Sequence, residues 1–207
     1  MIKNIIFDYG EVIVNVDPDK TIKALEALAD KETLTQGVSL NQTFFHEFER
    51  GQITAADFRS NLKALLNCKS TDEELDDAWN AMLEDLPEEN LQMLTDVKTK
   101  YRSFLLSNTN ELHLASLEKY LLKTYNFPDL AGFLEKEYYS HLIGMRKPDM
   151  EIFNFVLTEN KLSAAETLFL DDNPANIEAA KKLGIHTEQV SKSRPAILIL
   201  KEMNLIS

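Results

Sequence analysis

The chain has 207 residues, of which 44% are hydrophobic, and its 34 acidic and 22 basic side chains give a formal net charge of −12. A surface this negative argues against nucleic acid and against anionic membranes as partners. The length allows one large domain, or one domain with a smaller inserted module. The single cysteine, Cys68, allows no intramolecular disulfide, and neither a signal-peptide pattern nor a run of roughly 20 apolar residues is present. We therefore expect a cytoplasmic protein.

A buried strand is predicted at residues 2–8, where an apolar, β-branched run ends on Asp8 and Gly10 follows. No strand is predicted from there to about residue 100. Apolar residues in this stretch recur instead at helical spacing, and Asp17, Thr54 and Thr71 stand where N-caps are expected. These patterns predict helices within residues 17–30, 39–51, 54–66 and 70–83.

Strands and helices alternate after residue 100. The pattern predicts buried strands at residues 102–107, 167–172 and 185–190, with helices at residues 110–125, 147–161 and 174–184. Alternation of this kind makes a mostly parallel sheet covered on both faces. The sequence thus predicts a doubly wound, Rossmann-like α/β core at residues 1–16 and 93–207, with a helical cap inserted at residues 17–92.

Polar side chains stand where the predicted strands end. Because the carboxyl ends of parallel strands meet at one edge of a sheet, these side chains should converge beside the cleft where open α/β sheets bind ligands. A lysine in the sequence GMRKPD, just before a helix that begins with proline, should join them. The residues are Asp8, Ser107, Asn108, Lys147, Asp171 and Asp172.

This set of residues suits a magnesium ion and a phosphate group. The adjacent acids Asp171 and Asp172 repel each other, and Mg²⁺, which prefers one or two carboxylates with several waters, offsets that cost. Lys147 and Ser107 offer a positive charge and a hydroxyl donor to a phosphate, and the backbone N–H groups at Ser107 add further donors.

Four segments carry a resemblance to a known family. The sequences DYGEV (8–12), LSNTN (106–110), GMRKP (144–148) and FLDDN (169–173) resemble the four ordered motifs of the haloacid dehalogenase-like hydrolase superfamily. The chain is most similar to the branch of bacterial sugar-phosphate phosphatases that includes α-D-glucose-1-phosphate phosphatase. The resemblance runs from the first residue to about residue 190 and includes FERGQIT in the helical insert.

The resemblance implies a role for each of these residues. Asp8 would be the nucleophile that forms an aspartyl-phosphate, and Lys147 would neutralise charge on the nucleophile and the phosphate. Ser107 and Asn108 would bind phosphoryl oxygens. Mg²⁺ would be held by Asp172, by Asp8, by the carbonyl of Gly10 and by Asp171, directly or through water. The expected substrate is a small phosphorylated metabolite, and the resemblance to this branch implies a sugar phosphate.

One position departs from the usual pattern of the superfamily. Most of its phosphatases carry a second aspartate two residues after the nucleophile, as general acid for the leaving group. This sequence has Gly10 there, with Glu11 one residue further on. The branch that the chain resembles shares the glycine, so the acid step is the part of the mechanism that the sequence leaves open.

Two other functions are compatible with parts of the pattern. A haloacid dehalogenase would use Asp8 on carbon, but that chemistry needs no metal, and the pair Asp171 and Asp172 counts against it. A non-catalytic binding protein on the same fold finds support in Gly10 alone. The interpretation that we carry forward is a Mg²⁺-dependent phosphatase.

Several neighbouring residues are open to two interpretations. Arg146 is either a partner of the site or a surface charge, and His46, Glu49 and Arg50 lie on one predicted helix that could face the cleft. Asn173 and Asn176 are expected to orient the adjacent acids.

Overall fold

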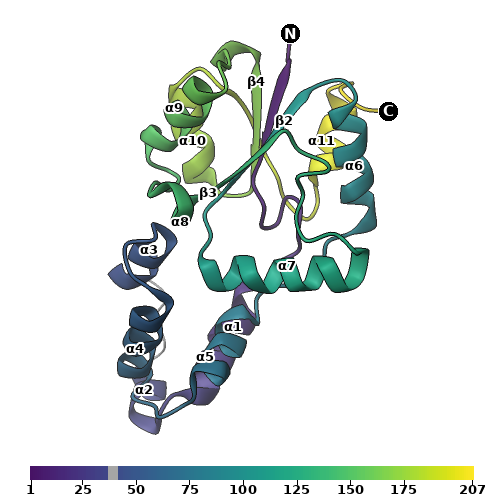
Figure 1. Ribbon diagram of the computed structural model, residues 1–207. Coiled ribbons are helices and arrows are strands. Elements are labelled where there is room, and N and C mark those ends of the chain that lie inside the picture. The colour runs from purple at the N-terminus through teal and green to yellow at the C-terminus, as the bar shows by residue number, and fades with distance from the viewer. Residues whose placement is uncertain (37–41) are drawn as a thin grey trace.

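The computed structural model describes residues 1–36 and 42–207 and shows a parallel α/β sheet with a group of helices beside it (Figure 1). The sheet has five strands in the order β3-β2-β1-β4-β5, and every pairing is parallel. The predicted doubly wound α/β fold is therefore confirmed. The strands are β1 (Asn4–Phe7), β2 (Arg102–Ser107), β3 (Lys136–Tyr139), β4 (Thr167–Asp171) and β5 (His186–Gln189).

Strand β1 lies at the centre of the sheet. Phe7 is in register with Leu105 of β2 and with Leu170 of β4. Ile5 and Phe7 pack into the core on one face and Ile6 into the core on the other, because successive side chains of a strand point to opposite faces. Burial on both faces explains why this strand is an unbroken apolar run.

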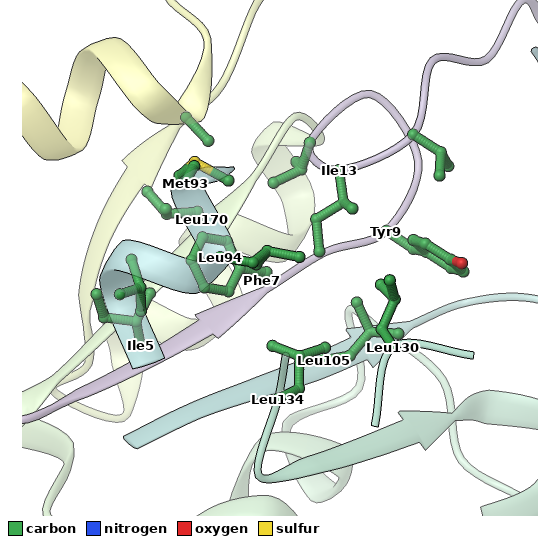
Figure 2. Packing of buried hydrophobic residues seen from close by; sticks show 14 of the residues in the cluster. Ile5, Phe7, Tyr9, Ile13, Met93, Leu94, Leu105, Leu130, Leu134 and Leu170 are labelled. Atoms are coloured by element: carbon green, nitrogen blue, oxygen red, sulfur yellow. The ribbon is translucent and has the colours of Figure 1, made fainter. Parts of the chain in front are cut away.

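Helices cover both faces of the sheet. The face that holds Phe7 packs against α6 (Glu88–Lys98), α7 (Glu111–Tyr125) and α11 (Ala196–Glu202), and Figure 2 shows Phe7 and Leu170 beside Met93 and Leu94 of α6. The opposite face packs against α9 (Met150–Glu159) and α10 (Pro174–Lys182). The short elements α8 (Ser140–Ile143) and η1 (Ala164–Glu166) complete this part of the chain. Within residues 1–36 and 42–207, no helix is long and apolar enough to cross a membrane.

Between β1 and α6 the chain forms a group of helices that we call the helical insert. It comprises α1 (Pro18–Leu28), α2 (Lys31–Gln36), α3 (Thr43–Glu49), α4 (Ala55–Leu66) and α5 (Asp72–Asn80). The insert has a hydrophobic core of its own, built around Phe45, Phe48, Phe58 and Trp79. Leu91 and Leu94 of α6, in contrast, belong to the core beneath the sheet.

The predicted N-caps of the insert are confirmed. The Asp17 side chain accepts a hydrogen bond from the N–H of Asp19, and Thr54 and Thr71 each form a capping box at the start of α4 and of α5. The helix predicted at 39–51 is observed from Thr43 to Glu49, and residues 39–41 of that prediction lie outside the described residues.

Two chain segments connect the insert to the sheet, and they pair with each other. Val16 and Leu83 form an antiparallel bridge. The N–H of Asn15 donates to the carbonyl of Asp85 at 2.8 Å, and that of Asp17 donates to the carbonyl of Met82 at 2.8 Å.

The sequence analysis did not predict strand β3. This strand lies at the edge of the sheet, and of its four residues, KEYY, only Tyr138 is buried. An edge strand contacts the core with few side chains, so it carries no apolar run from which it could be recognised.

The insert lies close to α8 at Gly51. This residue has φ 65°, and a Cβ added there would overlap the carbonyl oxygen of His141.

We expect Gly51→Ala to lower the free energy of unfolding by about 1–3 kcal/mol, because alanine disfavours this backbone conformation and the overlap forces a shift. Urea denaturation measures the change. Gly132→Ala is the matched control, since nothing lies within 4 Å of a Cβ there; equal losses in the two variants would refute the explanation.

Candidate active site

Asp8 follows β1 directly and lies at the centre of the carboxyl edge of the sheet. Its N–H donates to the carbonyl of Leu170 at 2.8 Å, which continues the pairing of β1 with β4 by one residue. Its Oδ1 accepts a hydrogen bond from the N–H of Tyr9 at 2.6 Å and lies 2.7 Å from Nζ of Lys147. Burial raises the pKa of Asp8 to about 7; Lys147 opposes this rise and Asp171 adds to it.

Lys147 connects the ends of three strands. Its side chain is fully buried, and Nζ lies 2.7 Å from Asp8 on one side and 2.7 Å from Oδ2 of Asp171 on the other. Burial by itself would lower the pKa of Lys147, but the two carboxylates outweigh it and raise the pKa above its usual value. The backbone N–H of Lys147 donates to Oδ1 of Asn108, and Nδ2 of Asn108 donates to the carbonyl of Lys147, both at 2.8 Å.

The adjacent acids Asp171 and Asp172 have different surroundings. Asp171 is fully buried and accepts hydrogen bonds from Nδ2 of Asn176 at 2.9 and 3.0 Å and from the N–H of Asn173 at 2.8 Å. The Asn176 side chain and the Asn173 backbone thus hold Asp171, while the Asn173 side chain caps α10 by accepting from the N–H of Ala175 at 2.9 Å. Asp172 is only half-buried, and burial, followed by repulsion from Asp171, raises its pKa. Asp171 is held by the protein, whereas the carboxylate of Asp172 remains more accessible.

These carboxylates suit a divalent cation. Asp8, Asp171 and Asp172 each offer an oxygen atom, and the three atoms lie within 4.8 Å of one another. With all three ionised and Lys147 protonated, the group carries a charge of about −2, which is costly in a partly buried site. A hard cation with oxygen ligands, such as Mg²⁺, cancels that charge.

The loop after Asp8 brings Gly10 to the same edge. The carbonyl of Tyr9 accepts hydrogen bonds from the N–H groups of Ile13 and Val14 at 2.8 and 2.9 Å, and the carbonyl of Val14 accepts one from Glu11 at 2.8 Å. These bonds close the loop without using the carbonyl of Gly10.

The segment that follows β2 is fixed beside Lys147. Ser107 is the last residue of β2 and is buried, and Asn108 next to it holds the backbone of Lys147. The N–H of Thr109 donates to Oγ of Ser140 at 2.9 Å, and that hydroxyl donates to the carbonyl of Thr109 at 3.0 Å. The structure therefore brings the predicted pair, Ser107 and Asn108, to the edge where Asp8 and Lys147 lie.

Two ion pairs that the sequence did not reveal join the insert to the segment between α8 and α9. Arg146, which the sequence left open, contacts Oε2 of Glu49, with Nε at 2.9 Å and Nη2 at 2.8 Å. Arg50, the next residue of the insert, contacts Oδ2 of Asp149 at 2.7 Å. The partners are 97 and 99 residues apart in the sequence, and no local pattern indicates such pairs.

A buried histidine, His113, joins the insert to α7 on another side. Its ring stacks on that of Trp79, with centroids 4.8 Å apart and planes at 13°. Nε2 lies 3.2 Å from the carbonyl of Trp79, and Nδ1 lies 3.2 Å from Nδ2 of Asn110. Burial lowers the pKa of His113 to about 4. The ring is therefore neutral near pH 7, and it contacts the insert rather than the carboxylate group.

Comparison with known proteins assigns the chain to a family. The family model for haloacid dehalogenase-like hydrolases matches residues 5–190. A D-ribitol-5-phosphate phosphatase from Bacteroides thetaiotaomicron is 35% identical over 190 residues, which cover 91% of this chain and 92% of that protein.

Solved structures share the whole fold. A HAD family enzyme from Bacteroides thetaiotaomicron, in complex with magnesium and inorganic phosphate, has a TM-score of 0.78 and 32% identity over 92% of this chain and 95% of that one. A HAD-like family hydrolase from Porphyromonas gingivalis has a TM-score of 0.87 and 28% identity, with both chains fully covered.

Proposed function

The chain belongs to the haloacid dehalogenase-like hydrolases, and from this premise we propose that it is a magnesium-dependent phosphatase for small sugar or sugar-alcohol phosphates. The observation that carries the proposal is the placement of Lys147 between Asp8 and Asp171, at 2.7 Å from each. The ammonium group of Lys147 thus lies next to the carboxylate of Asp8, which we propose as the nucleophile, and Ser107 and Asn108 lie at the same edge of the sheet. The relatives support the proposal: one is named for a sugar-alcohol phosphate, and another was solved with magnesium and inorganic phosphate.

We propose that Asp8 acts as the nucleophile. Its carboxylate oxygen attacks phosphorus, and the bond from phosphorus to the leaving oxygen breaks, which leaves an aspartyl-phosphate and an alcohol once the oxygen takes a proton. Water then attacks phosphorus, the bond to Asp8 breaks, and phosphate is released. Two anions must approach each other in the first step, so positive charge has to cancel their repulsion.

Within this mechanism Lys147 orients Asp8 and neutralises the phosphoryl oxygens, while Ser107 and Asn108 donate hydrogen bonds to them. The ligands of Mg²⁺ would be the carboxylates of Asp172 and Asp8 and the backbone carbonyl of Gly10. Asp171 would contribute directly or through water. When bound, that ion would supply charge neutralisation and fix the phosphate in line with the nucleophile.

We also propose that the helical insert is a cap that covers the site and selects the substrate. Its contacts with α8 and with Arg146 and Asp149 support this role, because they place α3 beside the segment that carries Lys147. The predicted division, with the cap at residues 17–92, stays a prediction.

A panel of compounds tests the proposed function. Phosphate release from glucose 1-phosphate, glucose 6-phosphate and D-ribitol 5-phosphate should be measured with and without Mg²⁺, next to halide release from a 2-haloacid in chelator. We expect Mg²⁺-dependent phosphate release and no halide. Halide release in chelator, with no phosphate release, would instead show the dehalogenase alternative to be correct.

Gly10 leads to a prediction about the leaving group. A positioned general acid contributes ~10²–10⁴-fold to a proton-transfer step, and an enzyme without one depends more on a leaving group that departs unaided. An anomeric hydroxyl is more acidic than a primary alcohol, so kcat/KM should be higher for glucose 1-phosphate than for glucose 6-phosphate. Gly10→Asp should bring the two kcat/KM values closer together, by speeding the hydrolysis of glucose 6-phosphate. A Cβ at this position would lie 3.5 Å from Val16, which is an ordinary contact.

Glu11 supplies the control for this prediction. Its Oε1 accepts a hydrogen bond from the N–H of Val16 at 3.3 Å and lies 4.0 Å from Nζ of Lys192, so the loop holds this carboxylate. Glu11→Gln should therefore leave unchanged the ratio of kcat/KM for glucose 1-phosphate to that for glucose 6-phosphate. A selective loss of glucose 6-phosphate hydrolysis in this variant would identify Glu11 as the general acid and contradict the prediction.

A further inference from the structure

The segment that carries Lys147 is held from two directions. On the side of the sheet, Nζ of Lys147 contacts Asp8 and Asp171, and its backbone exchanges two hydrogen bonds with Asn108. On the side of the insert, the preceding residue, Arg146, contacts Glu49 at the end of α3. One peptide unit thus joins an ion pair of the insert to the buried lysine of the site.

The contact between Arg146 and Glu49 is well formed. Two nitrogen atoms of the guanidinium, Nε and Nη2, approach the same oxygen of Glu49 at 2.9 and 2.8 Å. Only 18% of the Arg146 side chain and 26% of the Glu49 side chain are exposed. A partly buried pair with two donors restricts both side chains more than an exposed pair does.

A second ion pair beside it allows a comparison. Arg50 and Asp149 join the same end of α3 to the same segment, but Asp149 is 53% exposed and is separated from Lys147 by Pro148. Both pairs attach the same end of α3 to this segment, but only Arg146 is bonded directly to Lys147.

We infer that Glu49 and Arg146 are positioning residues, which set the placement of Lys147 between Asp8 and Asp171 according to whether the insert is seated on the site. When α3 is in place, the pair fixes the backbone of Arg146, and with it the start of the Lys147 side chain. When α3 moves away, that restraint is lost. This inference rests on the proposed function, since its kinetic consequence requires Lys147 to act on a phosphoryl group.

The kinetic test uses p-nitrophenyl phosphate with saturating Mg²⁺. We expect Arg146→Gln and Glu49→Gln each to lower kcat by roughly tenfold with little change in KM, because misplacement of a positioned group slows the reaction step more than binding. The double variant should be no slower than either single variant, as residues that act as one unit are not additive. Arg146→Lys should retain more activity than Arg146→Gln, and the matched control Arg50→Gln should keep its kcat.

A second readout does not depend on activity. Lys147 is fully buried, so acetic anhydride should leave it unmodified in the native protein, as judged by mass spectrometry of its peptide. Acetylation of Lys147 should rise several-fold in Arg146→Gln and Glu49→Gln but not in Arg50→Gln. This measurement keeps the inference testable even if no phosphate ester is hydrolysed, an outcome that would refute the proposed function alone.

Three results would overturn the inference. One is unchanged kcat and unchanged protection of Lys147 in Arg146→Gln. Another is a loss confined to Arg146→Gln with Glu49→Gln unaffected, which would show that Arg146 acts without the insert. Equal losses in Arg50→Gln would also overturn it, by showing that attachment of the insert alone accounts for the effect.

Discussion

Asp8→Asn should abolish turnover while the protein stays folded. The amide has nearly the same shape as the carboxylate but is a poor nucleophile, so we expect kcat to fall by at least about a thousandfold. Phosphate release under saturating Mg²⁺ measures the loss. Activity near that of the unchanged protein, in a variant verified by mass spectrometry, would exclude Asp8 as nucleophile.

The stability of this variant separates a chemical loss from unfolding. Burial raises the pKa of Asp8 from 3.8 to about 7, so the folded state disfavours the ionised group. Stability is therefore lost as pH rises between these values, and the neutral amide avoids that loss. At pH 8 without metal, the Tm of Asp8→Asn should not be lower than that of the unchanged protein, because the amide oxygen can still accept a hydrogen bond from the buried ammonium of Lys147, which an alanine could not. In the unchanged protein, borohydride provides a positive test of the aspartyl-phosphate. It reduces an acyl phosphate to an alcohol, which mass spectrometry would locate at residue 8.

Removing Mg²⁺ should have a comparably large effect. A chelator in excess should suppress turnover, and Asp172→Ala should raise the Mg²⁺ concentration needed for half-maximal activity by at least about tenfold, because it removes a carboxylate from the proposed ligand set. A titration of activity against Mg²⁺ measures this change. Full activity in chelator would remove the metal from the mechanism.

Asp171→Ala is the matched variant, and it should behave differently. It leaves the fully buried ammonium of Lys147 with one carboxylate partner fewer and removes the acceptor of Asn176. The loss of a partner from a buried pair costs on the order of 3 kcal/mol, which corresponds to a decrease in Tm of roughly 6–12 °C for a chain of this size. Asp172→Ala should change the Tm of the metal-free protein little. Equal decreases in the two variants would contradict the different surroundings that we describe.

The residues at the strand ends were predictable because their signal is local. Asp8, Ser107 and Asp171 each follow an apolar run that is buried on both faces, and parallel strands bring such ends to one edge. Lys147 follows no strand, so the strand pattern alone does not predict its place in the site. It was identified because the sequence GMRKP around it resembles a motif of the superfamily.

Other features depend on contacts between distant parts of the chain. The pair of Glu49 and Arg146 forms only once the insert is seated on the sheet, and charged residues by themselves do not reveal a partner 97 positions away. His113 shows no metal-ligand spacing in the sequence, yet folding buries it against Trp79. Strand β3 contributes too little apolar surface to leave a pattern.

The unequal contacts on the two sides of the insert predict how it opens. On one side, the ring of Trp79 stacks on that of His113, and the two connecting segments pair through the bridge between Val16 and Leu83. On the other side, the end of α3 meets the segment between α8 and α9 through partly exposed ion pairs, which salt weakens. We therefore expect the first side to serve as the hinge and the second as the mouth. Raising the ionic strength should widen the mouth while the hinge stays closed, so substrate would enter past α3.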